Sequence, residues 1–573
     1  MTTTAHALTT TSSTAFEKPG AGAWNLDTGH FGADSSRICQ DLIHVGCGNG
    51  STQGFAMMGA PLKQLDAEFV RGRYYMRMIP LVGGRLDLPT PPAPVLWLAA
   101  RLHPAFRRAE KTAKRALADR FWMSEHQRWV DEWRPRLEAD CRRFAAVEPS
   151  ALDDEDLADH VDDLYELAVF GTTLHFRLHV SDLGPIGLLL VSAREQGIES
   201  SEVMMALSGH SPATNAPGEA LAAIRRIAAE QPSPPVTLDG VRAMSSDAAR
   251  LLDAFLDEYG WRLTTGYDIR ALTLGEMPST ILTAINSTPD SVTAAESNDE
   301  AIRVGEEALS GLREQVDPAH RAELEQMVVD ARALYGLRDE NGPLTYQWPA
   351  GLLRRAVLEV SRRLDAADLL PDVGDRDPNG PNDTVFDLSA GEMSGLLRRS
   401  AGPSVDEIAE RARVRRDGML LDAPATLGRV EEDPPLWTMP KHLRRFLDAI
   451  FTVVEMLENE APASPTGQLS GIGIGTETYV GRACVVLEAD EAIADLEPGD
   501  VLVVPYTVPT YNAVLSIAGA VVSDSGGLLC HAAVIAREYG IPAVVGTGWG
   551  TSTIPDGATV EVNPTNGSVS VLA

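Results

Sequence analysis

The chain has 573 residues, which is too long for one hydrophobic core and predicts at least two domains. Its hydrophobic content of 44% and charged content of 23% are ordinary for a globular protein. The net charge of −32 argues against a general binder of nucleic acid or anionic membrane, because phosphate-rich partners would be repelled. An anionic substrate is therefore expected to meet a local basic pocket.

Residues 1–22 begin with a Thr- and Ser-rich segment that lacks the features of a signal peptide, and they are predicted to form a disordered tail. No apolar run is long enough to cross a membrane. The five cysteines are odd in number and include no C-x-x-C pair, so neither a zinc site nor a disulfide framework is indicated. We expect a cytoplasmic protein with no metal site of its own and no membrane or nucleic-acid partner.

Residues 23–457 are predicted to form one mainly helical domain. Apolar residues recur at helical spacing in four long stretches, Ala151–Leu183, Ser246–Tyr259, Ser297–Gly336 and Ala350–Leu364. Residues 458–475 then turn to Ala, Pro, Ser, Thr and Gly, which is typical of a hinge linker.

Residues 476–573 are predicted to form a small α/β domain that moves as one body. Five short strands are expected at Thr478–Leu487, Val501–Val504, Gly519–Val522, Ala543–Val545 and Thr559–Val562. One helix is expected between two of them, from about Leu529 to Tyr539.

The chemistry is predicted to lie where this helix begins. A strand ends at Val522, Gly526 and Gly527 turn the chain, and the helix begins near His531. An imidazole at the positive end of a helix lies beside unpaired backbone N–H groups, which bind phosphate. A neutral imidazole there is a good nucleophile, and the glycines let the backbone approach a phosphate closely. The alternative is that His531 only caps or packs against the helix.

The segment from Ser523 to Gly546, SDSGGLLCHAAVIAREYGIPAVVG, resembles the phosphohistidine signature of the phosphoenolpyruvate-utilising enzyme family. The resemblance extends over about residues 471–572 and implies a swivelling domain whose His531 carries a phosphoryl group. It also implies that Gly526, Gly527 and Cys530 bind that phosphate. Cys530 stands where Ser or Thr is commoner, and its thiol would still offer a weak donor.

The helical region resembles the acceptor-binding domain of the rifampin phosphotransferase and phenylphosphate synthase types of enzyme. The shared motifs occur in family order at Trp24–Phe31, Leu207–Asn215, Phe255–Arg262, Gly336–Glu340 and Val385–Met393. Trp261 and Gly266 depart from the rifampin pattern, which leaves acceptors other than macrolide-like compounds open. The sequence shows no ATP-grasp unit, the part that phosphorylates the histidine in these enzymes.

The resemblance implies that Arg338 neutralises the charge of the phosphoryl oxygens during transfer, because the planar guanidinium can donate two hydrogen bonds to them. The alternative is a surface salt bridge with Asp339 or Glu340. Arg262 carries a similar prediction with less support. His30, Trp261 and Glu340 are predicted to contact the acceptor, and His30 is equally consistent with a turn histidine.

His175 and His179 lie four residues apart, on one face of a predicted helix. We expect them to line the acceptor pocket, where one removes the proton of the acceptor hydroxyl as general base. Ordinary hydrogen-bonded helix histidines are an equal alternative. No third ligand is evident for a metal ion.

The sequence therefore predicts a phosphotransferase component. A separate ATP-grasp protein, which holds ATP and most of the Mg²⁺, would phosphorylate His531, and the swivelling domain would carry the group to a hydroxyl of a small organic acceptor. One alternative is a binding or regulatory protein that depends on phosphorylation and turns over no acceptor. Another is a chain that binds ATP itself.

Overall fold

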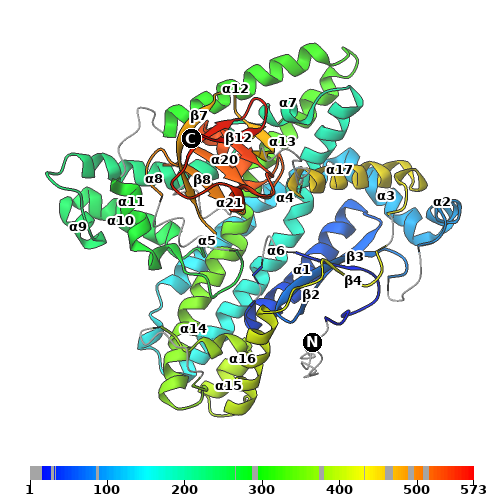
Figure 1. Cartoon of the computed structure of the whole chain (residues 1–573). Coiled ribbons are helices and arrows are strands. Elements are labelled where there is room, and N and C mark those ends of the chain that lie inside the picture. Colours follow the sequence, from blue (N-terminus) through cyan, green and yellow to red (C-terminus); the bar gives the residue numbers. More distant parts are fainter. Residues whose placement is uncertain are drawn as a thin grey trace.

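The computed structural model describes residues 16–27, 31–32, 34–84, 90–264, 266–286, 294–372, 380–430, 433–458, 469–487, 496–507, 515 and 517–572, with the backbone alone at 294–298. Residues up to 458 are mainly helical, and residues 469–572 build a small α/β unit around an eight-stranded sheet (Figure 1). This confirms the predicted combination of a large helical part and a small C-terminal α/β part. Helices α1, α6 and α12 to α14 are described below. The first part also contains α2 (Ala93–Leu102), α3 (Pro104–Asp119), α4 (Phe121–Arg128), η1 (Trp129–Trp133), α5 (Arg134–Ala145), α7 (Ser200–Met205), α8 (Pro212–Ala229), α9 (Leu238–Met244), α10 (Ser246–Tyr259), α11 (Pro278–Asn286), α15 (Ala390–Leu397), α16 (Val405–Met419) and α17 (Lys441–Glu458).

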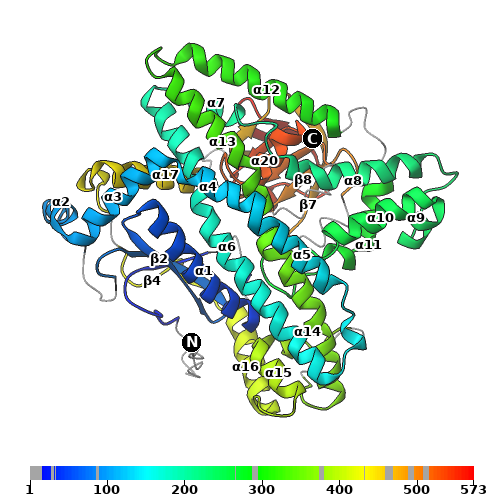
Figure 2. The same ribbon diagram turned by 180° about the vertical axis from the view of Figure 1, so that it is seen from behind.

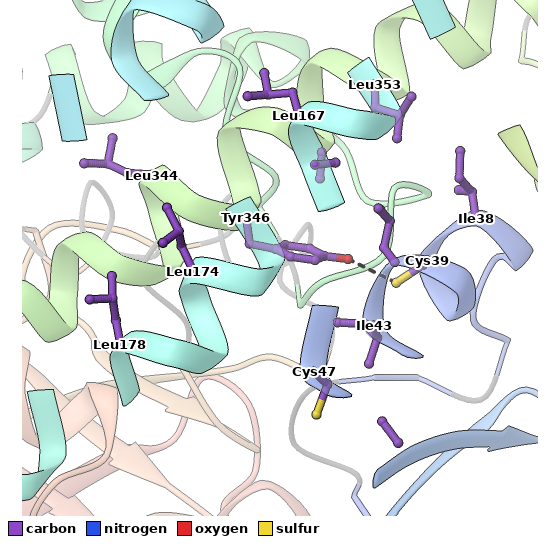
Figure 3. Close-up of a cluster of buried hydrophobic side chains, with 14 of the residues drawn as sticks. Ile38, Cys39, Ile43, Cys47, Leu167, Leu174, Leu178, Leu344, Tyr346 and Leu353 are labelled. Carbon is purple, nitrogen blue, oxygen red and sulfur yellow. Dashed lines mark hydrogen bonds between the residues drawn. The ribbon is translucent and has the colours of Figure 1, made fainter. Parts of the chain in front are cut away.

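The central element is α6 (Asp154–Glu195), a 42-residue helix that begins with Asp153 as its N-cap. Helix α1 (Arg37–Met58) packs along it, and glycines on α1 allow a close approach. A Cβ at Gly50 would lie 2.3 Å from the Thr173 carbonyl oxygen, so a larger residue there would force the two helices apart. The two helices supply many of the apolar side chains of the core in Figure 3.

A second long helical run faces α6. It consists of α13 (Arg321–Gly342), the π-helical segment η4 (Pro343–Gln347) and α14 (Trp348–Ala366). Tyr346 in η4 is buried and points toward Cys39 of α1, with 3.2 Å between hydroxyl oxygen and sulfur (Figure 3). Helical segments with the wider π pitch occur frequently at functional sites. The run of α13, η4 and α14 therefore packs against the face of α6 that carries the site residues.

The stretch of helical spacing over Ser297–Gly336 is helical but contains two helices. The chain forms α12 (Ala294–Gln315) and α13, with a break at residues 316–320. Pro318 explains the break, because proline lacks a backbone N–H and disfavours a helical residue before it. Helices α12 and α13 form the hairpin above the α/β unit in Figure 1.

The helical part also contains a small antiparallel sheet that the sequence prediction missed. Its strand order is β2-β3-β1-β4, with β1 (Trp24–Leu26), β2 (Leu62–Val70), β3 (Arg73–Pro80) and β4 (Thr426–Leu427). Phe16 packs against the buried residues of this sheet. Residues 16–22 of the predicted tail therefore belong to the described structure, and residues 1–15 lie outside the described part of the chain.

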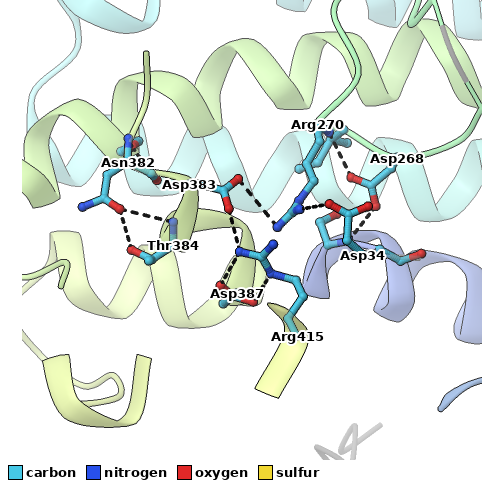
Figure 4. Close-up of polar contacts among 12 residues, drawn as sticks. Asp34, Asp268, Arg270, Asn382, Asp383, Thr384, Asp387 and Arg415 are labelled. Atoms are coloured by element: carbon cyan, nitrogen blue, oxygen red, sulfur yellow. Dashed lines mark hydrogen bonds and ion pairs between the residues drawn. The ribbon is translucent and has the colours of Figure 1, made fainter. Parts of the chain in front are cut away.

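A polar network holds the loop that follows α10. Arg270 of this loop pairs with Asp34 and Asp383, and Asp383 also pairs with Arg415, 2.6 Å apart (Figure 4). Arg415 in turn binds Asp387 of η5 (Asp383–Asp387) at 2.9 Å. These charges tie the loop to α16 and to the chain before α1, so its Tyr267 is held in a defined position.

The C-terminal sheet has the strand order β5-β12-β11-β7-β8-β9-β10-β6. Strands β7 to β10 run parallel to one another, and the outer strands pair antiparallel. The strands are β5 (Leu469–Ser470), β6 (Ile472–Ile474), β7 (Tyr479–Val485), β8 (Val501–Val504), β9 (Ala520–Ser523), β10 (Ala543–Val545), β11 (Thr559–Asn563) and β12 (Ser568–Val571). The single expected helix is α20 (His531–Tyr539), which connects β9 to β10, and a short helix, α21 (Gly550–Thr553), follows β10.

The predicted hinge at residues 458–475 needs a correction. Its residues 459–468 lie outside the described residues, whereas 469–474 already belong to the sheet through β5 and β6. The small unit therefore begins before the predicted boundary at 476. The edge pairing of β6 with β10 is a long-range contact that the local composition does not reveal.

The α/β unit is docked on the helical part through α20. The backbone N–H of Gly209 donates to Glu538 at 3.0 Å, and the Tyr539 hydroxyl donates to the Thr214 carbonyl at 3.2 Å. One apolar cluster runs from helices α6 and α13 into α20 without interruption. In both Figure 1 and Figure 2 the unit lies beside the α12–α13 hairpin and α8. Helix α20 therefore packs directly against the helical part, with its C-terminal end hydrogen-bonded to it.

Candidate active site

Helix α20 begins at the predicted site residue, His531, with Cys530 as N-cap. Gly526 has a positive φ of 118°, and a Cβ there would lie 2.6 Å from the Cys530 sulfur. The turn therefore requires glycine at this position. The N–H of Gly527 donates to the Leu457 carbonyl at 3.3 Å, and that of Leu529 to the Met456 carbonyl at 3.0 Å, so the end of α17 supports the loop.

The His531 imidazole is partly buried and is held from one side. Its Nδ1 lies 2.9 Å from the hydroxyl oxygen of Thr507. Burial, and to a smaller extent the positive charge of Arg338, lower the pKa of His531 to about 3. The ring is therefore neutral at physiological pH, the state in which an imidazole nitrogen is nucleophilic.

Arg338 of the helical part acts on His531 through its positive charge. It lies on α13, and Nη1 of its guanidinium is buried with no hydrogen-bond partner among the described residues. The two carboxylates of the alternative salt bridge are engaged elsewhere: Asp339 accepts from Ser211 and Thr214, and Glu340 accepts from Trp129 and Arg134. The guanidinium thus lies near the imidazole with unused donor capacity.

His175 and His179 meet as the helical spacing predicts. Their Nε2 atoms are 3.1 Å apart, and Nδ1 of His179 lies 3.5 Å from the carboxylate of Asp182 on the next turn of α6. His175 is buried, whereas the side chain of His179 is 38% exposed. Of the two histidines, His179 is therefore the one that a small molecule can reach.

Asp182 is the most unusual group of this cluster. Its side chain is 0% exposed, and its Oδ1 has no hydrogen-bond partner among the described residues. Its Oδ2 accepts from the Asn341 amide at 3.3 Å, and the same amide nitrogen donates to the His175 carbonyl at 3.2 Å. Because a buried carboxylate is costly without partners, its retention points to a role for its charge.

Three connections bring the two halves of the site together. Asn341 lies one helical turn after Arg338 on α13, so the two side chains share one face of that helix, and Asn341 contacts α6. The Thr345 hydroxyl lies 3.3 Å from Nδ1 of His175. The ring of Tyr267 is 5.7 Å from that of His175, and the charge of Arg338 lowers the pKa of Tyr267 against the larger effect of burial, which raises it to about 12.

The sequence analysis missed Asp182, Tyr267, Asn341, Thr345 and Thr507. Asp182 had a usable signal, because the spacing H-x-x-x-H-x-x-D puts all three groups on one helical stripe. Thr507 lies in a motif shared with the family but is separated from His531 by 23 residues. Tyr267 comes from the loop after α10, which only the fold brings to the site.

Two other predicted site residues lie elsewhere. Arg262 contacts the ring of Tyr259, 4.5 Å from its centroid, and pairs with Glu258. Trp261 stacks under Arg355 at 4.5 Å. Burial lowers the pKa of Arg262, which identifies it as a packed structural arginine. The structure does not bring these residues to His531.

Glu340 and His30 complete the predicted set. Glu340 binds Trp129 and Arg134 at 2.8 Å each, so its carboxylate joins α13 to η1 and α5. Both contacts hold helices of the fold together. His30 lies outside the described residues.

Two further findings concern the described residues alone. No three His, Cys, Asp or Glu side chains among them come together in a way that would hold a metal ion. None of their helices is both long enough and apolar enough to cross a membrane.

Comparison with known proteins shows what the C-terminal unit resembles. Residues 496–567 match the model of the mobile domain of PEP-utilising enzymes, and we call the unit of residues 469–572 the mobile domain after this similarity. Residues 176–339, which include His179, Asp182 and Arg338, match the model of the fourth domain of rifampicin phosphotransferase. Both resemblances inferred from the motifs, to the mobile domain and to the rifampin type, are thereby confirmed.

Three curated relatives illustrate the similarity. Rifampicin phosphotransferase of Streptomyces sviceus is 29% identical over 338 residues, which are 57% of this chain and 35% of that protein. That of Bacillus cereus is 27% identical over 331 residues, 56% of this chain and 34% of the relative. Phosphoenolpyruvate synthase of Aeropyrum pernix is 43% identical over 112 residues, 19% of this chain and 14% of the relative. The chain thus spans about a third of the length of the rifampicin phosphotransferases it matches.

Proposed function

We propose that this chain carries a phosphoryl group on His531 and transfers it to a hydroxyl of a small organic acceptor. The observation that carries the proposal is that the charge of Arg338 acts on His531, although the two residues come from different parts of the fold. A nucleophilic imidazole at a helix N-terminus and an arginine with free donors are the two parts that phosphoryl transfer needs. The similarity of both parts to phosphotransferases supports the same reaction.

The hydrogen bond at Nδ1 indicates which nitrogen reacts. If the Nδ1–H donates to the Thr507 hydroxyl, the lone pair of the neutral ring is on Nε2. Nε2 then attacks the phosphorus and forms an N–P bond, while the leaving phosphate oxygen keeps the electrons of the broken bond. The N–H groups at the start of α20 and the Arg338 guanidinium stabilise the transferred charge.

His179 is the proposed general base for the acceptor. Its exposed ring takes the hydroxyl proton while the acceptor oxygen attacks the phosphorus. Nε2 of His179, which faces Nε2 of His175 in the docked structure, turns to the acceptor hydroxyl to take this proton, and Asp182 beside Nδ1 stabilises the imidazolium that results. Thr345 positions His175. Positioning of the acceptor between His179 and His531 supplies most of the remaining acceleration.

The phosphoryl donor is proposed to be ATP, bound with Mg²⁺ on a separate ATP-grasp protein. Transfer of the β-phosphoryl group to His531, with a water molecule taking up the γ-phosphoryl group, leaves AMP and inorganic phosphate. The mobile domain would swing away from the docked position described here, receive the group at the partner, and return. Magnesium supplies charge neutralisation at the ATP step.

The acceptor class is a small hydroxyl compound. Relatives of the helical part are named for rifampicin, which they phosphorylate as their name states. Trp261 and Gly266 depart from the rifampin-type pattern, and Trp261 packs under Arg355. Phenols, alcohols and polyketide hydroxyls are therefore the acceptors to screen.

The test is to incubate the chain with ATP, Mg²⁺ and the ATP-grasp protein encoded nearest to it, and to measure the intact mass. We expect one added phosphoryl group, labile in acid, on the wild-type chain and none on His531→Ala. Screening acceptors for AMP formation then identifies the substrate. Labelling of His531 that no hydroxyl compound discharges would support the regulatory alternative, and labelling without the second protein would show that the chain binds ATP itself.

A further inference from the structure

Helix α2 is almost entirely apolar, yet it lies at the surface. Its sequence is APVLWLAARL, and Ala100 is its one buried residue. Val95 is 55% exposed, Leu98 50% and Leu102 64%, and Trp97 is 41% exposed. A helix that is apolar on all sides is normally buried. Contiguous exposed apolar surface of this kind marks a contact site.

The neighbouring helices surround this apolar helix with positive charge. Exposed cations project from α3 and from the start of α17, and we call them the basic surface: Arg107, Arg108, Lys111, Lys114, Arg115, Lys441 and Arg444. Helix α17 is fixed beside α3 because Glu110 accepts from the backbone N–H groups of His442 and Leu443. In both Figure 1 and Figure 2, α2, α3 and the start of α17 lie together at the edge of the molecule farthest from α9.

The cations of the basic surface have no acidic partner among the described residues, although the chain contains 81 acidic residues. Arginines elsewhere on exposed helices are paired, as Arg303 is with Glu300 and Arg413 is with Glu410. A cluster of unpaired cations in a chain of net charge −32 points to an anionic partner outside the chain.

The residue types decide between the partners. Two copies of this chain meeting through α2 would bring two basic surfaces together, which is electrostatically unfavourable. Protein interfaces favour Arg and are depleted in Lys, whereas Lys beside Trp and Leu is typical of helices that lie in a lipid headgroup region. Of the five lysines in the chain, Lys111, Lys114 and Lys441 belong to the basic surface.

We propose that α2, α3 and the start of α17 dock the protein on an anionic phospholipid bilayer. Val95, Trp97, Leu98 and Leu102 enter the headgroup region, and the basic surface contacts the lipid phosphates. The net charge led us to expect no membrane partner. A total charge averages over the molecule, however, whereas charges act over about 10 Å at physiological salt. The basic surface therefore acts locally.

The experiment measures co-sedimentation of the full chain with vesicles of phosphatidylcholine alone and with added phosphatidylserine. We expect binding that requires phosphatidylserine and weakens as salt increases. Lys111→Glu/Lys114→Glu should weaken it about tenfold or more, since each basic residue contributes separately. Trp97→Ser/Leu98→Ser should weaken it independently, because it removes the inserted side chains while the charges remain.

The matched control is Lys18→Glu/Lys63→Glu, which makes the same change in charge at exposed lysines outside the surface. It should bind like the wild type, and all variants should keep their helical circular dichroism. Equal loss in the control, or no binding to either vesicle, overturns the proposal. Retention on immobilised polyglutamate without vesicle binding overturns it too and identifies an acidic protein as the partner.

Discussion

The molecule holds two histidine environments side by side, and they differ in the charge that faces the ring. His531, at the start of α20, faces the guanidinium of Arg338, which together with burial lowers its pKa to about 3. His179, on α6, faces the buried carboxylate of Asp182. An imidazole beside a cation stays neutral, and the cation attracts an anion to the site. A carboxylate instead stabilises an imidazole that takes up a proton.

Under the proposed function, phosphate handling and proton handling are divided between the two parts of the chain. The mobile domain would bring the nucleophile, and the helical part would bring the arginine and the base. Transfer to an acceptor would then depend on docking through α20, because each part holds only some of these groups.

The largest effect is expected from His531→Gln, which keeps the shape but removes the nucleophilic nitrogen. Incorporation of phosphoryl into the chain should be abolished, as measured by intact mass. His44→Gln on α1 is the matched control, because that histidine lies outside the site and contacts Glu68. Undiminished incorporation in His531→Gln would place the phosphoryl on another residue.

Arg338→Ala should slow transfer from the phosphorylated chain to its acceptor about 10²–10³-fold, since one stabilising group of the transition state is lost. Arg338→Lys should recover part of the rate because the charge remains while the fork of donors is lost. The rate is measured by discharge of the labelled chain in a single turnover. Arg262→Lys is the comparison: it should lower Tm and leave the rate of discharge unchanged, as a structural arginine would.

Asp182→Asn should slow discharge to the acceptor about 10²-fold, the size of a general-base contribution. Phosphorylation of His531 should proceed at the wild-type rate, because Asp182 acts on the acceptor side only. Both rates are measured on one preparation. Equal slowing of the two would mean that Asp182 supports the fold and not His179.

A smaller effect concerns pH and docking. Burial and the nearby Asp339 raise the pKa of Glu538 to about 8, while Arg537 opposes the shift. The docked carboxyl holds its proton more tightly than an exposed one, so docking is favoured below the ordinary pKa of Glu and loses this support as pH rises through about 8. Tyr335 and Tyr539 are the other titratable groups near it.

Small-angle scattering should therefore show the wild-type chain expanding from about pH 6 to about pH 9, while Glu538→Gln stays compact. Glu561→Gln on β11 should behave like the wild type. A Glu538→Gln chain that expands over the same range would rule out this carboxyl as the cause.

Much of the mobile domain could be predicted from sequence. Its signature is contiguous, and β8, β10 and α20 lie within two residues of their predicted bounds. The helical half of the site was predicted where chemistry follows from helical spacing, as for His175 and His179. It was not predicted where the fold joins distant segments, as for Tyr267 and Asn341.

The failures have a common physical cause. Arg262 and Trp261 lie in a motif that resembles the family, but their contacts with Tyr259 and Arg355 are set by packing. In the sheet of β1 to β4, the pairing of β1 with β4 joins residues separated by hundreds of positions, such as Trp24 and Leu427. Pairings over such distances leave no local pattern to detect.

The most direct test of the central claim is phosphorus NMR of the chain after reaction with phosphoramidate, a small donor that needs no second protein. The account predicts one phosphoramidate signal, on Nε2 of His531, because Thr507 occupies Nδ1. Thr507→Val should allow a second signal from the Nδ1 adduct. A phosphoryl group on Nδ1 alone, or on another residue such as Cys530, would contradict the account.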